Sequence, residues 1–584
     1  MELPFALLSR RMPLRSPLRH APDRAAHDHS PLLYRPVLPA PCPLILPTLV
    51  TAMLLISCAD SPTDLESVAS VSVFPDHATI PVGDSLQLTA TVKDAAGNML
   101  LGRVVTWASG NQTVAAVSPS GLVVGVAVGS AAIVATSEGQ SDTATITVTP
   151  GTLVITAGPT ELRQGDVVTY SAEGHDADGA PISEATLSWS VAPNAAGFFG
   201  AHGEFVGYLP GRAAVIVSAP GLADTLPITI QPRSLSGAVT VVGQGTQTAR
   251  FTSDLWVHGS YAYTGAFGGR SEGGDTLVGR IFVWDISDPS SPSLTDSVVV
   301  DATKVNDVKV RADGAVAVLT HEGSSDGLNG ITLLDLSDPA HPSPITRFTT
   351  SLEWGVHNVW IESEFVYAAV DGIGGLRVID ISVPTNPRMV ASFYAESSFL
   401  HDVYVRDGLA FLSHWDAGLI ILDVGNGVAG GAPSNPVEVS RIGMAGGQTH
   451  NAWYWPATGY VFVGEEDFGT PGIMHIVDVR DLSNPREVAT FRVPGAPPHN
   501  FWLDEKRGVL YLAWYQNGIR VLDVSGTLLG ELDRQGREIA SLQYAAEGEC
   551  FRGAATCTWA PQLHDGLLYI SDVNSGLWVL RPSF

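Results

Sequence analysis

The sequence predicts an all-β protein built from several domains. Apolar residues make up 45% of the 584 residues and charged residues only 16%, which excludes a disordered acidic chain. Short apolar runs rich in Val, Ile, Thr and aromatic residues recur between turn residues, whereas long segments with a helical period are hard to find. From residue 237 onward, similar strand units recur at regular spacing, which predicts a repeat architecture.

The chain is strongly acidic, with a net charge of −27 from 32 Lys and Arg against 59 Asp and Glu. Such a surface repels phosphate backbones, so we expect no nucleic-acid partner. Solubility alone explains a charge of this sign and size. If the charge has a specific role, divalent cations are the partners that it favours.

The N-terminal region reads as an export signal. Residues 1–43 are rich in Arg and Pro, and an apolar run of about 14 residues then begins at Leu44, which suits a signal peptide and is short for a membrane span. The run ends in Leu55-Ile56-Ser57-Cys58, which resembles a bacterial lipobox. The resemblance implies cleavage before Cys58 and acylation of its thiol.

We therefore expect a leader and lipoprotein signal peptide over residues 1–58 and a polar tether over 59–67. The mature protein would be exported and held to a membrane by its lipid, at the bacterial cell surface or in the periplasm. An ordinary cleaved signal peptide with an incidental cysteine is the alternative. The long leader also leaves open a translation start at Met12.

Two further cysteines, Cys550 and Cys557, lie seven residues apart in a loop that contains Gly and Ala. In an exported chain this spacing predicts a disulfide. A metal site with two cysteines is the weaker alternative, because the spacing matches no common zinc pattern.

Residues 68–149 alternate as strands do and include Val105-Thr106-Trp107-Ala108-Ser109. Trp107 can fill the core of a two-sheet sandwich, and Gly121, Gly125 and Gly129 permit tight turns. The segment resembles group 2 bacterial Ig-like domains. The resemblance implies a spacer or adhesion module.

Residues 152–232 repeat this plan more loosely, with Trp189 in place of Trp107 and a second glycine segment over 203–213. We expect a second Ig-like domain there. Neither domain shows a clustered nucleophile, base or metal motif, so we interpret both as a stalk.

The C-terminal region repeats an apolar strand that ends in Asp. Successive copies are 50, 45, 43, 55 and 45 residues apart, which is typical of the blades of a β-propeller. A turn of the form Ser-Asp-Pro often follows, in which Pro fixes φ and the Ser and Asp side chains bond the backbone. The Asp residues are Asp285, Asp335, Asp380, Asp423, Asp478 and Asp523.

This unit resembles the LVIVD repeat, which is named for an apolar strand ending in Asp. A seventh copy, Leu577-Trp578-Val579-Leu580, ends the chain without the Asp. We therefore expect a seven-bladed propeller over residues 237–584. Residues 237–243 resemble the fourth strand of other blades, so we predict that they complete the last blade and close the ring.

Each blade begins with a recurring residue pair before its inner strand. Four consecutive blades place His at the same position, so these side chains should form an arc at one mouth of the central channel. The pairs are Ser253-Asp254, Asn306-Asp307, His357-Asn358, His401-Asp402, His450-Asn451, His499-Asn500 and Trp559-Ala560.

Two interpretations of the four histidines compete. In one, each His or Asn bonds a neighbouring turn, as the Ser and Asp pairs do. In the other, the arc binds a divalent or transition metal through neutral imidazoles. Placement on separate blades argues against one shared ion.

The loops between the second and third strands of each blade should lie on the same face. We expect them to make an acidic face with exposed aromatic anchors for a partner. The candidate residues are His321, Glu322, Asp371, His414, Trp415, Asp416, Glu465, Glu466, Asp467, Trp514, Tyr515 and Asp572.

These patterns favour a lipid-anchored surface protein of the binding or adhesion class, with a protein or glycan partner on the propeller face and the Ig-like domains as its stalk. The alternative is a propeller enzyme or metal carrier that uses His357, His401, His450 and His499. No nucleophile–base pair and no Gly-rich nucleotide loop is evident, so we assign no catalytic residue and favour a non-enzyme. A bound metal is the one cofactor that the sequence suggests.

Overall fold

The computed structural model describes residues 66–584 except 150, 176–180, 182, 185–186, 220–221, 269–278, 373–374, 396–398, 470–471 and 552–553. The predicted leader, Cys58 and most of the tether therefore lie outside the described residues. In the described part of the chain, no helix is long and apolar enough to cross a membrane.

The first domain is a β-sandwich, as the sequence predicts. Its sheets have the strand orders β2-β9-β8-β5 and β3-β7-β6, and β1 pairs with β4. The strands are β1 (Ser70–Phe74), β2 (His77–Pro81), β3 (Ser85–Gln87), β4 (Thr89–Lys93), β5 (Thr106–Ser109), β6 (Ala115–Val117), β7 (Leu122–Gly125), β8 (Gly129–Ser137) and β9 (Gln140–Thr149).

Trp107 packs against the core of this sandwich. Gly121 has a φ of +84°, and a Cβ there would lie 2.9 Å from the Trp107 ring and 2.8 Å from the Leu88 carbonyl oxygen. The close approach of the tryptophan thus requires glycine at this turn.

The second domain repeats the same strand plan. Its sheets have the orders β11-β18-β17-β14 and β12-β16-β15, and β10 pairs with β13. The elements are β10 (Thr152–Ala157), β11 (Glu161–Arg163), β12 (Val167–Thr169), β13 (Ser171–His175), β14 (Ser188–Ala192), the 3₁₀ helix η3 (Asn194–Ala196), β15 (Gly197–Phe199), β16 (Glu204–Gly207), β17 (Gly211–Ala219) and β18 (Leu222–Gln231).

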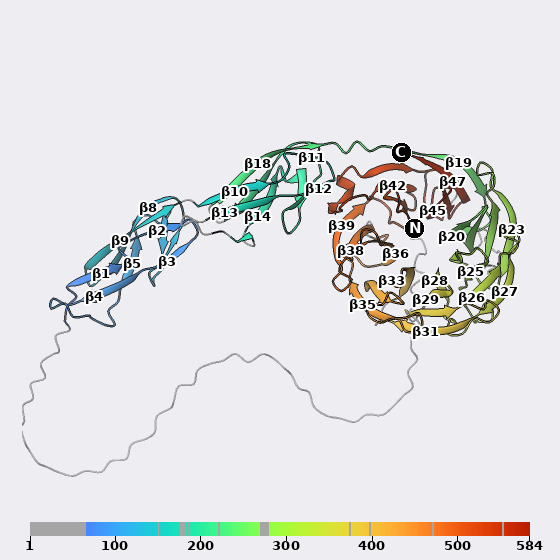
Figure 1. Cartoon of the computed structure of the whole chain (residues 1–584), viewed down its shortest axis with the longest axis horizontal. Helices are drawn as coiled ribbons and strands as arrows, with labels where there is room; N and C mark the ends of the chain where they lie inside the picture. The colour runs from blue at the N-terminus through green and yellow to red at the C-terminus, as the bar shows by residue number, and fades with distance from the viewer. Residues whose placement is uncertain are drawn as a thin grey trace, which may run out of the picture. The chain divides into compact units, whose positions relative to one another are not determined.

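The remaining described residues form seven sheets arranged as a ring (Figure 1). We number them as blades 1 to 7 in chain order of their inner strands. The strands of blades 1 to 3 are β20 (Phe251–His258), β21 (Tyr261–Phe267), β22 (Gly279–Asp285) and β23 (Ser293–Val300); β24 (Val308–Val310), β25 (Val316–Thr320), β26 (Ile331–Asp335) and β27 (Ser343–Phe348); and β28 (Val356–Glu362), β29 (Phe365–Val370), β30 (Gly375–Asp380) and β31 (Arg388–Tyr394).

Blades 4 and 5 follow the same order, with a short strand β43 added parallel to β39 in blade 5. Their strands are β32 (Leu400–Arg406), β33 (Leu409–His414), β34 (Gly418–Asp423) and β35 (Val437–Ile442), then β36 (Thr449–Trp455), β37 (Tyr460–Glu465), β38 (Ile473–Asp478), β39 (Arg486–Arg492) and β43 (Gly530–Glu531).

Blade 6 has the order β40-β41-β42-β44, and blade 7 has the order β45-β46-β47-β19. The N-terminal strand β19 pairs antiparallel with the last strand β47, so the predicted closure of the ring is confirmed. The elements are β40 (Phe501–Asp504), β41 (Val509–Ala513), β42 (Ile519–Asp523), the 3₁₀ helix η4 (Leu532–Arg534), β44 (Glu538–Leu542), β45 (Thr558–His564), β46 (Leu567–Asp572), β47 (Gly576–Ser583) and β19 (Ala238–Thr246).

The middle strands of each blade explain the apolar repeat. Every residue of β33 and β34 is buried, because both faces pack against neighbouring blades, whereas the outer strand β31 is largely exposed or half-buried. The Asp that ends the third strand holds the turn that follows. Asp285, for example, accepts hydrogen bonds from the backbone N–H and the hydroxyl of Ser287.

Candidate metal centre

The inner strands of blades 3, 4 and 5 carry a β-bulge at the position where their histidines lie. The pairing of β28 with β29 shifts register between Val356 and Asn358, and His357 is the extra residue. His401 and His450 occupy the same place in β32 and β36. A bulge changes the direction of a side chain, so both the bulged histidine and the residue after it can face the channel.

All four predicted histidines lie together as the histidine arc (His357, His401, His450 and His499), the last of them just before β40. Neighbouring ring centroids are 4.4, 4.2 and 4.2 Å apart in chain order. Trp559 extends the row, with its ring 4.1 Å from that of His499. Histidines on separate blades are therefore in direct contact, and the expectation that distance argues against a shared ion is wrong.

Two members of the arc also hold the next blade. The Nδ1 of His401 lies 3.0 Å from the carbonyl oxygen of His450, and the Nδ1 of His499 lies 2.7 Å from that of Trp559. A carbonyl only accepts, so each Nδ1 must carry the proton and donate it. Burial lowers the pKa of both imidazoles well below the usual value, so they are neutral and Nε2 carries a free lone pair.

His450 differs from its neighbours. It is buried, and neither of its ring nitrogens has a hydrogen-bond partner among the residues that the structure describes. Burial lowers the pKa of this imidazole to about 3. A buried imidazole without partners is costly unless a ligand completes it.

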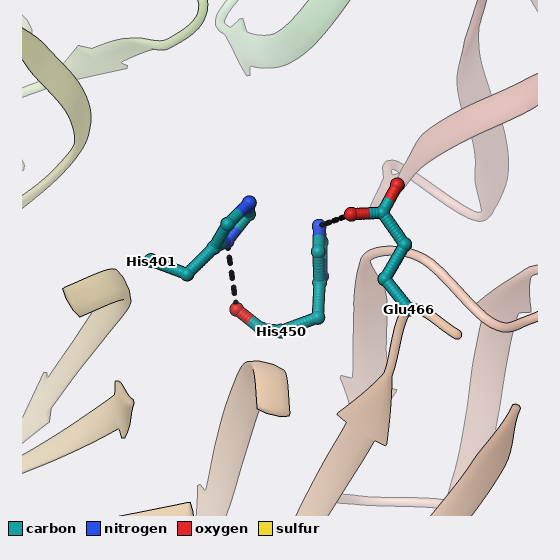
Figure 2. A group of neighbouring side chains, drawn as sticks. All are labelled: His401, His450 and Glu466. Atoms are coloured by element: carbon teal, nitrogen blue, oxygen red, sulfur yellow. Dashed lines mark hydrogen bonds and ion pairs between the residues drawn. The ribbon is translucent and has the colours of Figure 1, made fainter. Parts of the chain in front are cut away.

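Glu466 lies beside His450 in the loop after β37. Its Oε2 is 3.7 Å from the Nε2 of His450 (Figure 2), and the hydroxyl of Tyr515 donates to the other oxygen of Glu466. Burial raises the pKa of Glu466 to about 7. One donor atom each from His401, His450 and Glu466 lie within 4.8 Å of one another. We call these three residues the mouth site.

A second group at the same mouth is satisfied internally. His357 Nδ1 lies 2.9 Å from Glu322 Oε1, and Lys304 Nζ lies 3.3 Å from the same oxygen. Asp371 completes a set of possible ligand atoms with Glu322 and His357. Because the Lys304 ammonium already neutralises Glu322, this group is less suited to a metal cation than the mouth site.

The expectation of exposed loop anchors is wrong for several predicted residues. Trp514 is 0% exposed and donates from Nε1 to the Ala496 carbonyl oxygen, and Tyr515 is 1% exposed. Their rings fill the contact between neighbouring blades and cannot meet a partner.

Other predicted loop residues form contacts within their own blades. His321 bonds the Thr332 hydroxyl, Glu465 pairs with His475, and Asp572 accepts from the Cys557 N–H. His414 is also buried. Of the predicted residues, only Asp416 is exposed, while Glu322, Asp371, Trp415, Glu466 and Asp467 are half-buried.

Sequence reasoning missed two exposed aromatic residues in the connections between strands. Trp354 is 60% exposed, in the segment before β28, and Phe468 is 48% exposed, in the loop between β37 and β38. The available signal was that Trp354 lies three residues before His357 and Phe468 two residues after Glu466.

The residues that follow the histidines line a cavity deeper in the channel. One residue after each His is Asn or Asp, and three residues after it is Trp or Tyr, and both positions face a cavity of about 50 Å³. We call this space the lower cavity. The repeated pattern His-(Asn or Asp)-x-aromatic was visible in the sequence, but its last position was not recognised.

The predicted disulfide is present, because Cys550 is bonded to Cys557. The metal alternative for this pair is therefore excluded in the oxidised protein.

Comparisons with known proteins agree with this architecture. Residues 67–148 match the model of the bacterial Ig-like domain (group 2). The LVIVD repeat matches residues 249–270, 278–300, 325–350, 355–394 and 400–443.

Among curated proteins, the chain is similar to Ice-binding protein 1 of Shewanella frigidimarina (strain NCIMB 400), with 27% identity over 289 residues. The match covers 48% of this chain and 31% of that protein, so the chain spans about a third of the relative's length.

Among solved structures, it is similar to the β-propeller domain of Cps50 (Swd1) from Myceliophteria thermophila, at 12% identity and a TM-score of 0.40, covering 57% of this chain and 98% of that one. The computationally designed Ika8 protein matches at 12% identity and a TM-score of 0.38, covering 58% and 98%. From the two family matches and the ring of seven sheets, we conclude that the chain carries a group 2 bacterial Ig-like domain followed by an LVIVD-repeat β-propeller.

Proposed function

We propose that the protein binds a transition-metal ion at the mouth of its propeller, through His401, His450 and Glu466. The observation that carries the proposal is the buried His450 imidazole, which has no hydrogen-bond partner within the described part of the chain and lies beside a carboxylate and a second imidazole. A coordinated ion would satisfy all three groups at once.

The donor set selects the class of ion. Imidazole nitrogens with one carboxylate oxygen suit Zn²⁺, Cu²⁺, Ni²⁺ or Fe²⁺ and disfavour Mg²⁺ and Ca²⁺. The His401 ring is fixed by its Nδ1 bond to the His450 carbonyl, and Glu466 is fixed by Tyr515, so both ligands are oriented in advance. Three protein ligands leave a coordination position open, where water or a group of a partner could bind.

Metal analysis tests this proposal. Protein purified without a His tag should contain, or take up from Zn²⁺ and Cu²⁺ solutions, one ion per chain. His450→Gln should weaken binding by at least about 100-fold, because the loss of a ligand exceeds the usual 10–100-fold effect of losing an outer-shell group. His341→Gln, at an exposed histidine outside the arc, is the matched control. Equal binding by His450→Gln and wild type would overturn the proposal.

A protein or glycan partner at the same mouth is the second candidate function. The exposed rings of Trp354 and Phe468 favour it, since exposed aromatic residues commonly anchor interfaces. The variant Trp354→Ala plus Phe468→Ala should lose ligands that wild type retains on a glycan array or in a pull-down. Unchanged binding by this variant would remove that surface from consideration.

We also propose that the protein is exported and held to a bacterial membrane by a lipid on Cys58, with the Ig-like domains as its stalk. The sequence over residues 44–58 and the disulfide between Cys550 and Cys557 support export, since disulfides persist in oxidising compartments. Metabolic labelling with a radioactive fatty acid should mark wild type and not Cys58→Ser. Equal labelling of the two would contradict the anchor.

A further inference from the structure

The lower cavity lies on the channel side of the same bulges that carry the histidine arc. The bulges at His357, His401 and His450 turn the next residue into the channel. Asn358, Asp402 and Asn451 thus line the cavity together with Asn500 and Asp254. These side chains offer oxygen atoms, whereas the mouth site offers chiefly nitrogen. The two layers of the channel therefore have different ligand chemistry.

Two of these oxygens are buried without a partner. Asn451 is 4% exposed, and its Oδ1 accepts no hydrogen bond from any residue that the structure describes. The same holds for the Oδ1 of Asn500 among those residues. The Nδ2 of Asn500 donates to Asp254 Oδ1 at 3.3 Å, which fixes the amide so that Oδ1 is the atom left available.

Carboxyl groups outnumber ammonium groups among the described residues of this part of the channel. Lys309 Nζ contacts both Asp254, at 2.9 Å, and Asp307, and it lies 5.4 Å from the centre of the Trp256 ring. The buried Lys309 ammonium thus contacts two carboxyl groups. Asp402 is a third carboxyl group, on the side of the ring that also carries Asn451 and Asn500, and it accepts a hydrogen bond from the Val403 N–H.

A circle of aromatic side chains also lines the cavity. Trp360, Tyr404, Trp453 and Trp502 follow one another with centroid distances of 4.5, 4.9 and 5.1 Å, and Trp256 lies 6.2 Å from Trp502. A water molecule needs roughly 10–15 Å³ of such space, so a cavity of about 50 Å³ accommodates a cation with a few waters.

We infer that the lower cavity is a second cation site, which takes a hard, oxygen-preferring ion of the Ca²⁺ class through the Asp402 carboxylate and the Oδ1 atoms of Asn451 and Asn500. Ca²⁺ accepts carboxylate and amide oxygens in flexible geometry and completes its shell with water. The ion would satisfy both unpartnered amide oxygens and balance the Asp402 carboxylate. This site does not depend on the mouth site, whose imidazoles select a different class of metal.

Terbium luminescence tests the inference directly. Tb³⁺ is a hard ion that replaces Ca²⁺, and bound Tb³⁺ is sensitised by nearby tryptophans, of which the cavity has four. Full-length protein stripped of metal with EDTA should give saturable, tryptophan-sensitised emission that Ca²⁺ displaces. Asp402→Asn should weaken Tb³⁺ binding by about ten-fold or more, because affinity at such sites follows ligand charge.

A variant that adds a carboxylate, rather than removing one, tests the inference even if Asp402→Asn folds poorly. Asn451→Asp adds a carboxylate to the same wall and should tighten Tb³⁺ binding by about ten-fold. No saturable emission, or the same affinity in wild type and both variants, would overturn the inference. Emission that is lost in Glu466→Gln and kept in Asp402→Asn would place the ion at the mouth and overturn it as well. Failure of Zn²⁺ and Cu²⁺ to bind would contradict only the proposed function.

Discussion

The channel mouth has two halves, blades 1 and 2 without the histidine arc and blades 3 to 6 with it. In both halves a side chain at the start of a blade donates a hydrogen bond to a backbone carbonyl of the next blade. In blades 1 and 2, the Ser253 hydroxyl donates to the Val305 carbonyl oxygen at 2.6 Å, and Asn306 Nδ2 donates to that of His357 at 2.9 Å. In blades 4 and 6, His401 and His499 do the same with Nδ1. Every one of these bonds joins a blade to the next.

This comparison shows that the two interpretations of the histidines are compatible. A serine hydroxyl or an asparagine amide donates its hydrogen bond to the neighbouring blade. Such a short side chain has no second nitrogen that could bind a ligand on its far side. An imidazole donates the same hydrogen bond from Nδ1 and still has Nε2 on the far side of its ring, where it can bind a metal. The blades that carry the histidine arc can therefore join their neighbours and bind a metal with the same residues.

The largest effect on metal binding should follow from replacing a histidine of the arc with the residue that blade 2 has at that position. His450→Asn places the residue type of blade 2 at the centre of the mouth site and should weaken Zn²⁺ or Cu²⁺ binding by at least about 100-fold. The unfolding temperature should change little, because the His450 ring nitrogens make no hydrogen bond to any described residue. Isothermal titration and thermal melts measure the two quantities. A large loss of stability with unchanged metal affinity would show a purely structural histidine.

The buried cations of the two halves should respond differently to pH. His475 lies between Glu465, at 3.1 Å, and Glu487, at 2.5 Å; burial opposes its charge, but the two carboxylates raise its pKa to about 9. Its stabilisation is complete below about pH 6.5 and is lost as the pH rises through 9, by up to about 1.4 kcal/mol per pH unit. The partial exposure of Glu487 reduces this slope. Lys309, whose pKa is raised by Asp254 and Asp307 against the cost of burial, stays charged throughout.

Urea unfolding followed by tryptophan fluorescence between pH 6.5 and 9.5 checks this prediction. The variant His475→Gln should remove the slope, because its amide does not titrate. A slope that persists in His475→Gln would assign the pH dependence to another group.

A smaller effect is expected from the half without histidines. Ser253→Ala removes the hydroxyl that bonds the Val305 carbonyl and should destabilise the propeller by roughly 1–2 kcal/mol, because that carbonyl is left buried with one bond fewer. Metal affinity should stay the same, since Ser253 lies outside the mouth site. Denaturant unfolding and metal titration of the same sample test both parts. Weaker metal binding would mean that the two halves are coupled.

The smallest effect is expected at the end of the histidine arc. His357 is paired with Glu322, which also contacts Lys304, so it is not free to bind the ion. His357→Gln should weaken metal binding by about ten-fold or less, through the contact of its ring with His401. A loss as large as that of His450→Asn would extend the metal site to the neighbouring group.

Local patterns that repeat were enough to predict the ring and the arc. Asp ends the third strand of six blades and marks the turn that follows, and His recurs at the start of four consecutive inner strands, three of which carry a bulge there. Glu466 was named only as part of an acidic loop, since its contact with His450 joins residues 16 positions apart that meet through the bulge and the next loop.

The sequence failed where a side chain's role depends on what packs against it. Trp514 and Trp354 are both tryptophans in loops or at strand ends, yet the first fills a contact between blades and the second is 60% exposed. Neither the residue type nor the strand period distinguishes the buried tryptophan from the exposed one. The pairing of Lys309 with carboxylates from blade 1 and its own blade was likewise invisible before the ring was closed.

The sequence by itself determined the strands, their sevenfold repetition and the recurrence of histidine at one position, because each of these follows from local periodicity and turn chemistry. Only the tertiary structure decided that neighbouring imidazoles touch, that His450 lacks a hydrogen-bond partner among the described residues, and that amide and carboxylate oxygens gather beneath them. The physical reason is that ring closure sets the width of the channel, and this width decides which equivalent side chains meet.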